Sequence, residues 1–203
     1  MNLSKNIRPY KGKSLVEIPD SFVVFDIETT GLNTTYNDII EIGAIKVIDN
    51  KIVDTFHTLI KPRNKISYFI TNLTGITNEM VKDAPSSKET LIDFLNYIGT
   101  LTLVGHNVNF DINFVYDKLI ENNLPFLSNN YVDTLRLSRK LLKDLRNHKL
   151  GDLALYYSIN YEGAHRGLKD AEITLKVLEK LREEIMMQYN TTENFKNSFH
   201  SKE

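Results

Sequence analysis

The chain has 203 residues and no cysteine, which excludes disulfide bonds, thiolate metal sites and cysteine nucleophiles. Hydrophobic residues make up 41% and charged residues 25%, which is typical of a soluble globular protein, and the length suggests one domain. With 25 basic and 26 acidic side chains the net charge is −1, which disfavours a protein that grips a long duplex through many phosphates but not one that holds a chain end.

Targeting signals are not evident in the sequence. No apolar run approaches the ~20 residues of a membrane span. The N-terminal stretch "MNLSKNIRPYKGKS" is positively charged but lacks the apolar core of a secretory signal. We therefore expect a cytoplasmic protein that makes no contact with a membrane.

The first half of the chain is predicted to be rich in strands. Residues 1–20 are polar with scattered lysines, and we interpret them as an N-terminal arm. The stretch "FVVFD" (22–26) is typical of a buried strand. The stretches "IIEIGAIKVID" (39–49) and "KIVDTFHTLI" (51–60) predict a hairpin that turns at Asp49 and Asn50. A long connection with short helical turns follows over 61–85.

The second half alternates helices with one further strand. Apolar spacing of three and four predicts helices over residues 86–98, 109–123, 133–145, 150–159 and 167–188, with a short buried strand over 100–106. Residues 189–203 form a polar tail that we expect to be mobile. The main domain then spans 21–188. Antiparallel strands followed by alternating strands and helices predict an α/β fold with a mixed sheet flanked by helices, whose active site lies at strand ends.

Acidic residues recur at three such ends. Asp26 and Glu28 are two apart on a strand and therefore share a face, where their repulsion is about 4 kcal/mol at 4 Å and an effective dielectric of 20. Asp111 lies in the first turn of a helix, and Asp170 lies near the start of the last helix, five residues after His165. Each acid alone is also explained by a solvated turn or a favourable charge at a helix start.

As a set, these acids predict different chemistry. Asp and Glu oxygens are the ligands that Mg²⁺ and Mn²⁺ prefer. Four carboxylates can hold two such ions about 3.5–4 Å apart, an arrangement used for in-line attack on phosphodiesters. A neutral histidine nearby can take a proton from the attacking water. The spacing permits this convergence but does not prove it.

The stretches "FDIETTG", "HNVNFDINF" and "HRGLKDA" resemble, in order, the three motifs of the DnaQ-like (DEDDh) 3′–5′ exonucleases, and the resemblance covers roughly residues 22–181. It implies an RNase H-like fold with a mixed sheet of about five strands and helices on both faces. It also implies two divalent cations, Mg²⁺ or Mn²⁺. Asp26 would bridge both ions, Glu28 and Asp170 would bind the ion that carries the nucleophilic water, and Asp111 would serve the second. His165 would be the general base, and the product would be a nucleoside 5′-monophosphate released from a 3′ end.

The resemblance also implies contacts to the terminal nucleotide from Thr29, Thr30, Gly31 and Leu32. Leu32 would wedge against the last base, unless it is a core leucine. Two further residues have alternatives of the same kind. Asn107 would bind near the 3′ hydroxyl or only form a turn, and Phe110 would stack on a base or pack beneath the site. The third motif departs from the family at Gly167, where alanine is more common, and we expect this glycine to loosen the loop that carries His165.

Several functions remain open at this point. The leading hypothesis is a metal-dependent exonuclease acting on a DNA 3′ end, a single strand or a frayed terminus. It would serve either as the proofreading component of a DNA polymerase, through a polymerase partner, or as a free-standing nuclease. An RNA-directed exonuclease or oligoribonuclease would use the same residues. A catalytically silent nucleic-acid-binding module and a small-molecule phosphoesterase are further alternatives. His57 and His148 fit none of the motifs, and we expect them to be surface or packing residues, whereas Asp133 is expected to cap a helix.

Overall fold

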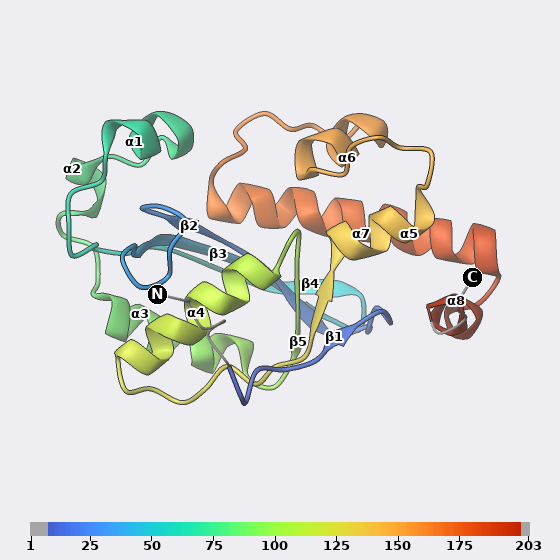
Figure 1. Ribbon diagram of the computed structural model, residues 1–203, viewed down its shortest axis with the longest axis horizontal. Coiled ribbons are helices and arrows are strands. Elements are labelled where there is room, and N and C mark those ends of the chain that lie inside the picture. The colour runs from blue at the N-terminus through green and yellow to red at the C-terminus, as the bar shows by residue number, and fades with distance from the viewer. Residues whose placement is uncertain (1–7, 200–203) are drawn as a thin grey trace, which may run out of the picture.

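The computed structural model describes residues 8–199, and within them six strands form one mixed sheet with helices on both faces (Figure 1). The strand order is β1-β6-β5-β2-β3-β4. The strand β3 runs antiparallel to its two neighbours β2 and β4, whereas β5 pairs with β2, β6 with β5 and β1 with β6 in parallel. The sheet contains β1 (Ser14–Leu15), β2 (Phe22–Thr29), β3 (Ile39–Ile48), β4 (Lys51–Leu59), β5 (Thr102–Gly105) and β6 (Tyr131–Asp133).

Eight helices complete the described part of the chain. The predicted connection over 61–85 contains α1 and α2, and the predicted helices of the second half are all present within a few residues of their expected ends. The helices are α1 (Tyr68–Thr74), α2 (Asn78–Val81), α3 (Ser87–Ile98), α4 (Asn109–Glu121), α5 (Thr134–Leu141), α6 (Leu150–Tyr156), α7 (Gly167–Tyr189) and α8 (Thr192–Ser198). Among these residues, no helix is both long and apolar enough to cross a bilayer.

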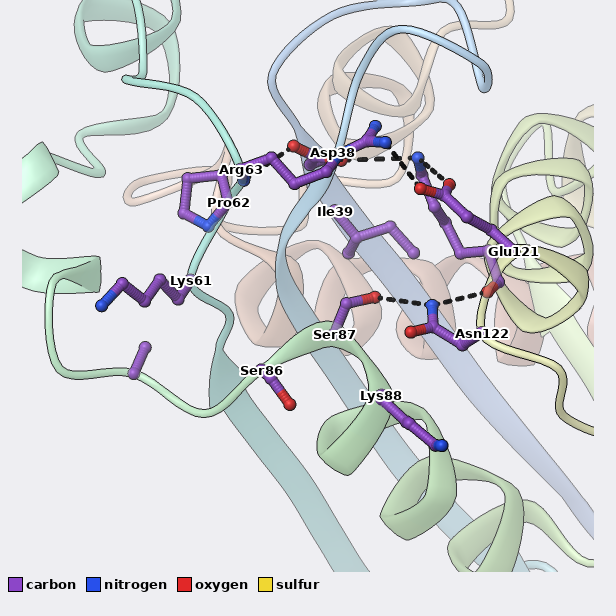
Figure 2. A pocket seen from close by; sticks show the side chains of 12 residues that line it. Asp38, Ile39, Lys61, Pro62, Arg63, Ser86, Ser87, Lys88, Glu121 and Asn122 are labelled. Atoms are coloured by element: carbon purple, nitrogen blue, oxygen red, sulfur yellow. Dashed lines mark hydrogen bonds and ion pairs between the residues drawn. The ribbon is translucent and has the colours of Figure 1, made fainter.

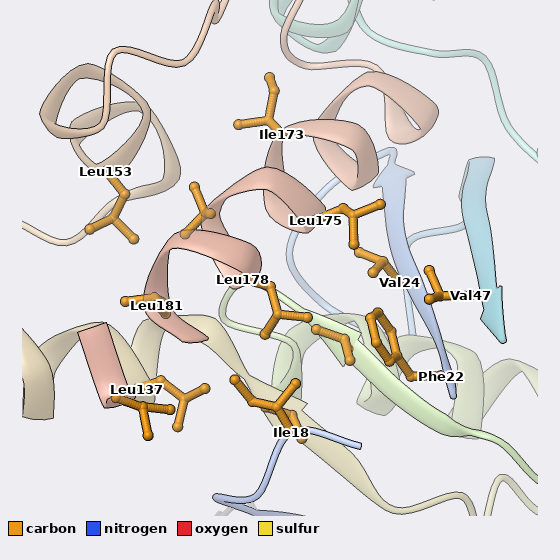
Figure 3. Close-up of a cluster of buried hydrophobic side chains, with 14 of the residues drawn as sticks. Ile18, Phe22, Val24, Val47, Leu137, Leu153, Ile173, Leu175, Leu178 and Leu181 are labelled. Carbon is orange, nitrogen blue, oxygen red and sulfur yellow. The ribbon is translucent and has the colours of Figure 1, made fainter. Parts of the chain in front are cut away.

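The side chains of the central strand β2 alternate between two hydrophobic cores, one on each face of the sheet. Phe22 and Val24 face α7 in a cluster of buried side chains that α5 and α6 also line (Figure 3). Val23 and Phe25 point to the opposite face, where α3 and α4 cover the sheet. Because side chains two apart share a face of a strand, Asp26 and Glu28 must continue the row of Phe22 and Val24, toward α7.

The predicted hairpin is confirmed and its turn explains the register. Asp49 and Asn50 connect β3 to β4 with φ angles of 48° and 60°. Positive φ at both central residues is required by the type I′ turn, whose twist matches that of paired strands, and Asn and Asp tolerate it best after glycine. The pairing of Ile48 with Lys51 follows from this two-residue turn.

The structure differs from the sequence-based prediction in three respects. The sheet has six strands within the described residues rather than about five, because the short strands β1 and β6 pair with each other. Part of the predicted N-terminal arm is therefore packed, with Ile18 in the same buried cluster as Leu178 (Figure 3). The tail is not wholly mobile, since α8 buries Phe195. Residues 1–7 of the arm and 200–203 of the tail lie outside the described residues.

Candidate active site

Three of the predicted acids meet at the carboxyl-terminal end of β2. Asp26 and Glu28 come from β2 and Asp170 from the first turn of α7. Each offers a carboxylate oxygen, and these oxygens all lie within 4.8 Å of one another. The alternation of β2 aims the first two side chains at α7, and the position of α7 then brings the third to them.

Two glycines allow α7 to approach the sheet so closely. A Cβ on Gly43 of β3 would lie 2.0 Å from the backbone nitrogen of Leu168, and one on Gly167 would lie 2.9 Å from the nitrogen of Gly43. The expectation that Gly167 loosens the loop is therefore wrong. Gly167 is buried, and its N–H donates a hydrogen bond of 2.7 Å to Oε2 of Glu41, so it is held firmly where the helix meets the strand.

Asp111 reaches the same place from the other face of the sheet. It lies in the first turn of α4, which follows β5, and its side chain is buried. The strand β5 ends at Gly105, so the Ile27 N–H of the longer strand β2 has no neighbour strand there, and it donates to Oδ1 of Asp111 at 3.3 Å. Asp111 is outside the trio defined by the 4.8 Å separation, but its charge is near enough to raise the pKa of Asp26.

The acids suppress one another's ionisation. Burial and then the charges of Asp111, Asp170 and Glu28 raise the pKa of Asp26 well above its usual value. Burial and the neighbouring carboxylates raise the pKa of Glu28 to about 8, and burial is also the main reason why the pKa of Asp111 rises to about 8. The pKa of Asp170 is raised by burial as well, against an opposing hydrogen bond from the His165 N–H. At neutral pH, such a cluster is stable only with protons or cations among its oxygens.

The donor set fits a divalent cation. Oδ1 of Asp170 is buried and has no hydrogen-bond partner among residues 8–199. Buried polar atoms are nearly always hydrogen-bonded, so an orphaned carboxylate oxygen beside two other carboxylates indicates an absent positive ligand. Oxygen ligands of this kind suit Mg²⁺ and Mn²⁺, and no cysteine competes for a softer metal.

His165 stands at the edge of the cluster with its side chain exposed. Its φ angle of 65° lies in the left-handed region, which is uncommon for histidine and calls for external restraint. Part of that restraint is the hydrogen bond of 3.1 Å from its N–H to Oδ2 of Asp170. The ring lies edge-on to that of Tyr161, with 6.3 Å between centroids.

Four of the predicted nucleotide contacts lie at the last residue of β2 and on the loop that follows it. Thr29 donates to the Gly31 carbonyl at 2.7 Å, and Thr30 exchanges two hydrogen bonds of 2.9 Å with the backbone of Asp38. Glycine is needed at position 31, because an added Cβ would lie 2.7 Å from the side chain of Asn37. Leu32 is 86% exposed, so it is not a core leucine.

The other two predicted contacts are placed differently. Asn107 is exposed and has a φ of 58°, so it does form a turn, and its N–H donates to Oδ1 of Asp133 at 2.8 Å. Asp133 also accepts from the Leu135 N–H at 3.0 Å, which confirms it as the cap of α5. Phe110 packs against the core on the α3 and α4 side of the sheet, with the centroid of its ring 5.0 Å from that of Phe114. Whether any of these residues touches a nucleotide stays a prediction.

A pocket of about 470 Å³ lies beside this loop, and the acids that line it are paired with cationic side chains (Figure 2). Arg63 donates to Asp38 at 2.7 Å and to Glu121 at 2.6 Å, and the buried Lys118 contacts both carboxylates. Although burial opposes it, the hydrogen bonds from Arg63 hold the pKa of Asp38 below its usual value. These acids have cationic side chains as partners, whereas the pKa values of the β2 acids indicate that their own neighbours do not supply enough positive charge.

Sequence reasoning did not predict Glu41, and it expected His57 to be a surface or packing residue, which agrees with its exposed position on β4. Glu41 is fully buried on β3 opposite Glu28, and its charge contributes to the raised pKa of Asp26. His57 lies on β4, and its Nε2 is 2.7 Å from Oε1 of Glu41. The available signal was a glutamate inside the apolar stretch "IIEIGAI", where a charge needs a partner.

Comparison with known proteins agrees with this geometry. Residues 23–178 match the model of a family described as exonuclease. The chain belongs to this exonuclease family. Its motifs place it with the DnaQ-like members, and the mixed sheet with helices on both faces is the RNase H-like fold of that family.

The curated relatives of this exonuclease are much longer proteins. It is 48% identical over 176 residues to a PolC-type DNA polymerase III from Caldanaerobacter subterraneus subsp. tengcongensis, an alignment that covers 85% of the chain and 12% of the relative. It is 39% identical over 165 residues to the PolC-type DNA polymerase III of Bacillus subtilis, covering 80% of the chain and 11% of the relative. The chain therefore spans about an eighth of the length of such polymerases.

Solved structures share the fold. Exonuclease X in complex with 5′ overhanging duplex DNA superposes with a TM-score of 0.66 at 26% identity, covering 87% of this chain and 98% of that one. E. coli Exonuclease I in complex with a dT13 oligonucleotide superposes with a TM-score of 0.75 at 16% identity, covering 85% of this chain and 43% of that one. The second likeness concerns the fold alone.

Proposed function

We propose that this chain is a metal-dependent 3′–5′ exonuclease that removes nucleotides from a DNA 3′ end as 5′-monophosphates. The observation that carries the proposal is the trio Asp26, Glu28 and Asp170, whose oxygens lie within 4.8 Å of one another. The family match and the polymerase relatives support the reaction and the choice of DNA. The relatives also support a proofreading role beside a polymerase, which would supply the frayed 3′ terminus.

The metal ligands of the proposal are the four acids. Asp26, Glu28 and Asp170 would hold one Mg²⁺ or Mn²⁺, and Asp26 with Asp111 would hold a second. Bound ions of this kind supply a polarised phosphate and an acidified water for in-line displacement. The chain itself fixes the four carboxylates in place, with Asp26 and Glu28 on the strand β2, Asp111 in the first turn of α4 and Asp170 in the first turn of α7.

His165 and the loop after β2 have the remaining roles. The exposed imidazole of His165 would accept the proton of the attacking water. Thr29, Thr30, Gly31 and Leu32 would line the terminal nucleotide, with the exposed Leu32 against its base, and Asn107 would lie near the 3′ hydroxyl. Phe110 would support the site from below, because its ring already packs on Phe114.

A time course on three labelled substrates tests the proposal. The substrates are a primer–template with a 3′ mismatch, the matched duplex and a single-stranded RNA, each with Mg²⁺ or Mn²⁺ and with chelator. We expect 5′-mononucleotides from DNA, fastest from the mismatched end and only with metal. The Asp26→Ala variant is the control and should be inactive, because it lacks the shared ligand. Faster cleavage of RNA would overturn the choice of DNA, and metal-independent or absent cleavage would overturn the function.

A further inference from the structure

Glu41 is a fifth carboxylate at the site, and it differs from the other four. Its side chain is fully buried, at 0% exposure, directly across from Glu28 in the pairing of β2 with β3. Although burial alone would raise it, hydrogen bonds from Arg166, His57 and Gly167 hold the pKa of Glu41 below its usual value. Glu41 is therefore an ionised group with its own cation, and is not one of the acids that wait for a metal ion.

Two of the three partners of Glu41 come from the segment that carries His165. Arg166 donates from Nε at 3.0 Å and from Nη2 at 2.7 Å to Oε1 of Glu41, and the Gly167 N–H donates to Oε2 at 2.7 Å. An arginine fork on a carboxylate fixes direction as well as distance. The two residues that follow His165 are thus hydrogen-bonded to Glu41 of β3.

His165 needs such an attachment. Its backbone has a φ of 65°, and conformations of this kind persist only where the surroundings determine them. On one side its own N–H is held by Asp170, and on the other side Arg166 and Gly167 are held by Glu41. The backbone of His165 is thus fixed, while its exposed imidazole is accessible to a substrate.

Arg166 also lies close to the metal-ligand trio. Its charge lowers the pKa of Glu28, against the stronger effects of burial and of the neighbouring carboxylates. In return, Glu28 adds to the effect of Glu41 in raising the pKa of Arg166. The guanidinium of Arg166 is hydrogen-bonded to Glu41 on β3, and its charge also acts on Glu28.

We propose that Glu41 and Arg166 are positioning residues, whose ion pair fixes the loop that presents His165 to the attacking water. This role rests on the proposed exonuclease function. The pair acts through the backbone of residues 165–167, and neither side chain needs to touch the nucleotide. His57 completes the pair from β4, with its Nε2 donating to the carboxylate at 2.7 Å.

Steady-state kinetics with a single-stranded DNA oligonucleotide and saturating Mn²⁺ test the proposal. In Glu41→Gln and Arg166→Gln, we expect kcat to fall by about 10–100-fold, because a misplaced catalytic group costs rate, while KM stays within about threefold. The double variant should be no slower than the slower single variant, because both changes break one interaction. Arg166→Lys keeps the charge but loses the fork, so it should recover part of the rate.

The matched control is Arg182→Gln on the same helix. Arg182 ties the far part of α7 to the sheet side through the carbonyl of Pro19 at 2.9 Å and through Asn50. Its loss should lower the melting temperature but leave kcat within about twofold, because it holds no part of the His165 loop. A kcat loss in Arg182→Gln as large as that in Glu41→Gln, at equal loss of melting temperature, would overturn the positioning role.

Hydrogen exchange gives a second measurement that does not depend on activity. In Glu41→Ala, the amides of residues 165–168 should exchange at least about tenfold faster than in the wild type, because the Gly167 N–H loses its acceptor. Unchanged exchange there, or an unchanged kcat in folded Glu41→Gln, would overturn the inference. An inactive wild-type chain would instead overturn the proposed function, while the exchange comparison would still decide whether Glu41 holds the loop.

Discussion

At the scale of single residues, the site separates two kinds of buried carboxylate. Glu41 and Asp38 have arginines within hydrogen-bond distance, and their pKa values are lowered. Glu28 and Asp111 lie among other acids, and burial raises their pKa values to about 8. The first kind accepts hydrogen bonds that hold the backbone in place. The second kind lacks enough positively charged neighbours, so a bound cation would favour its ionised form.

This separation predicts how pH changes the stability of the metal-free protein. The folded-state pKa values of Glu28 and Asp111, about 8, lie above the ordinary values of 4.5 and 3.8 that hold for an unfolded chain. The stability that they contribute is therefore fully present below about pH 4 and is lost as pH rises through 8. In chelator, the melting temperature should fall between pH 6 and pH 8.5 by an amount that Asp26→Asn reduces, as calorimetry can measure. A melting temperature in chelator that rises over this range would contradict the assigned shifts.

The role of His165 leads to a second prediction. In His165→Ala, the rate of nucleotide release should fall by roughly 10²–10⁴-fold, since this is the usual contribution of a general base. Binding of Mn²⁺ should persist, because the side chain is exposed and is not among the three ligands. A pH–rate profile identical to that of the wild type in this variant would exclude His165 as the base.

Which site residues the sequence could predict depends on their neighbours in the chain. Asp26, Glu28 and Asp170 were predicted because each lies in a local pattern, a strand end or a helix start, and they do meet. Glu41 and Arg166 were not predicted as a pair because 125 residues separate them and nothing local indicates that β3 and α7 touch. The exposure of Leu32 likewise depends on the finished fold, so the sequence left its wedge and core interpretations equal.

At the scale of elements, the docking of α7 on β3 decides whether the acids meet. The approach is possible because both surfaces carry a glycine at the point of contact. Side chains normally fill the space between a helix and the sheet that it covers. Here the backbone of α7 touches the backbone of β3 at Gly43, which shortens the reach that Asp170 needs.

Gly43→Ala tests this contact. The new Cβ would lie 2.0 Å from the Leu168 backbone nitrogen, so α7 must shift, and the free energy of unfolding should fall by roughly 1–3 kcal/mol. The rate of nucleotide release should fall by about tenfold or more, because Asp170 moves with the helix. Gly12→Ala is the control, since its Cβ would lie 1.9 Å from the carbonyl oxygen of Asn129, which belongs to neither β3 nor α7. Equal effects of the two variants on rate would show that the close docking is not needed.

Phe195→Ala tests the packing of α8. The Phe195 ring is 1% exposed and contacts the rings of Tyr189 and Phe199 at centroid distances of 5.1 Å. Its removal should lower the free energy of unfolding by roughly 3 kcal/mol in a urea titration, with kcat within about twofold. Met187→Ala, at a residue 74% exposed, should change stability by less than about 0.5 kcal/mol. A Phe195→Ala variant as stable as the wild type would mean that α8 does not pack.

Elements with a long hydrophobic period could be predicted from the sequence, whereas the strands β1 and β6 and the helix α8 could not. The hairpin of β3 and β4 and the helix α7 have clear apolar spacing. The strands β1 and β6 have two and three residues, which is too few for any period, and their pairing depends on the whole sheet. The helix α8 has one buried side chain in a polar segment, so only the core that receives Phe195 reveals it.

At the scale of the whole molecule, the fold brings acids from distant parts of the chain to one end of β2. Asp26 and Glu28 come from the centre of the sheet, Asp111 from one covering layer and Asp170 from the other (Figure 1). A cation bound at this end of β2 is attracted by all four carboxylates at once, whereas a pair of surface carboxylates attracts it less strongly. We therefore expect the converged acids to bind divalent cations.

Calorimetric titration with Mn²⁺ at pH 8 measures this claim most directly. The wild type should bind Mn²⁺ saturably, and Asp26→Asn, with one ligand neutralised at nearly constant volume, should bind at least about tenfold more weakly. The Asp54→Asn variant, at an exposed acid of β4, should bind as the wild type does. Saturable binding that Asp26→Asn leaves unchanged, or no saturable binding by the folded wild type, would contradict the account.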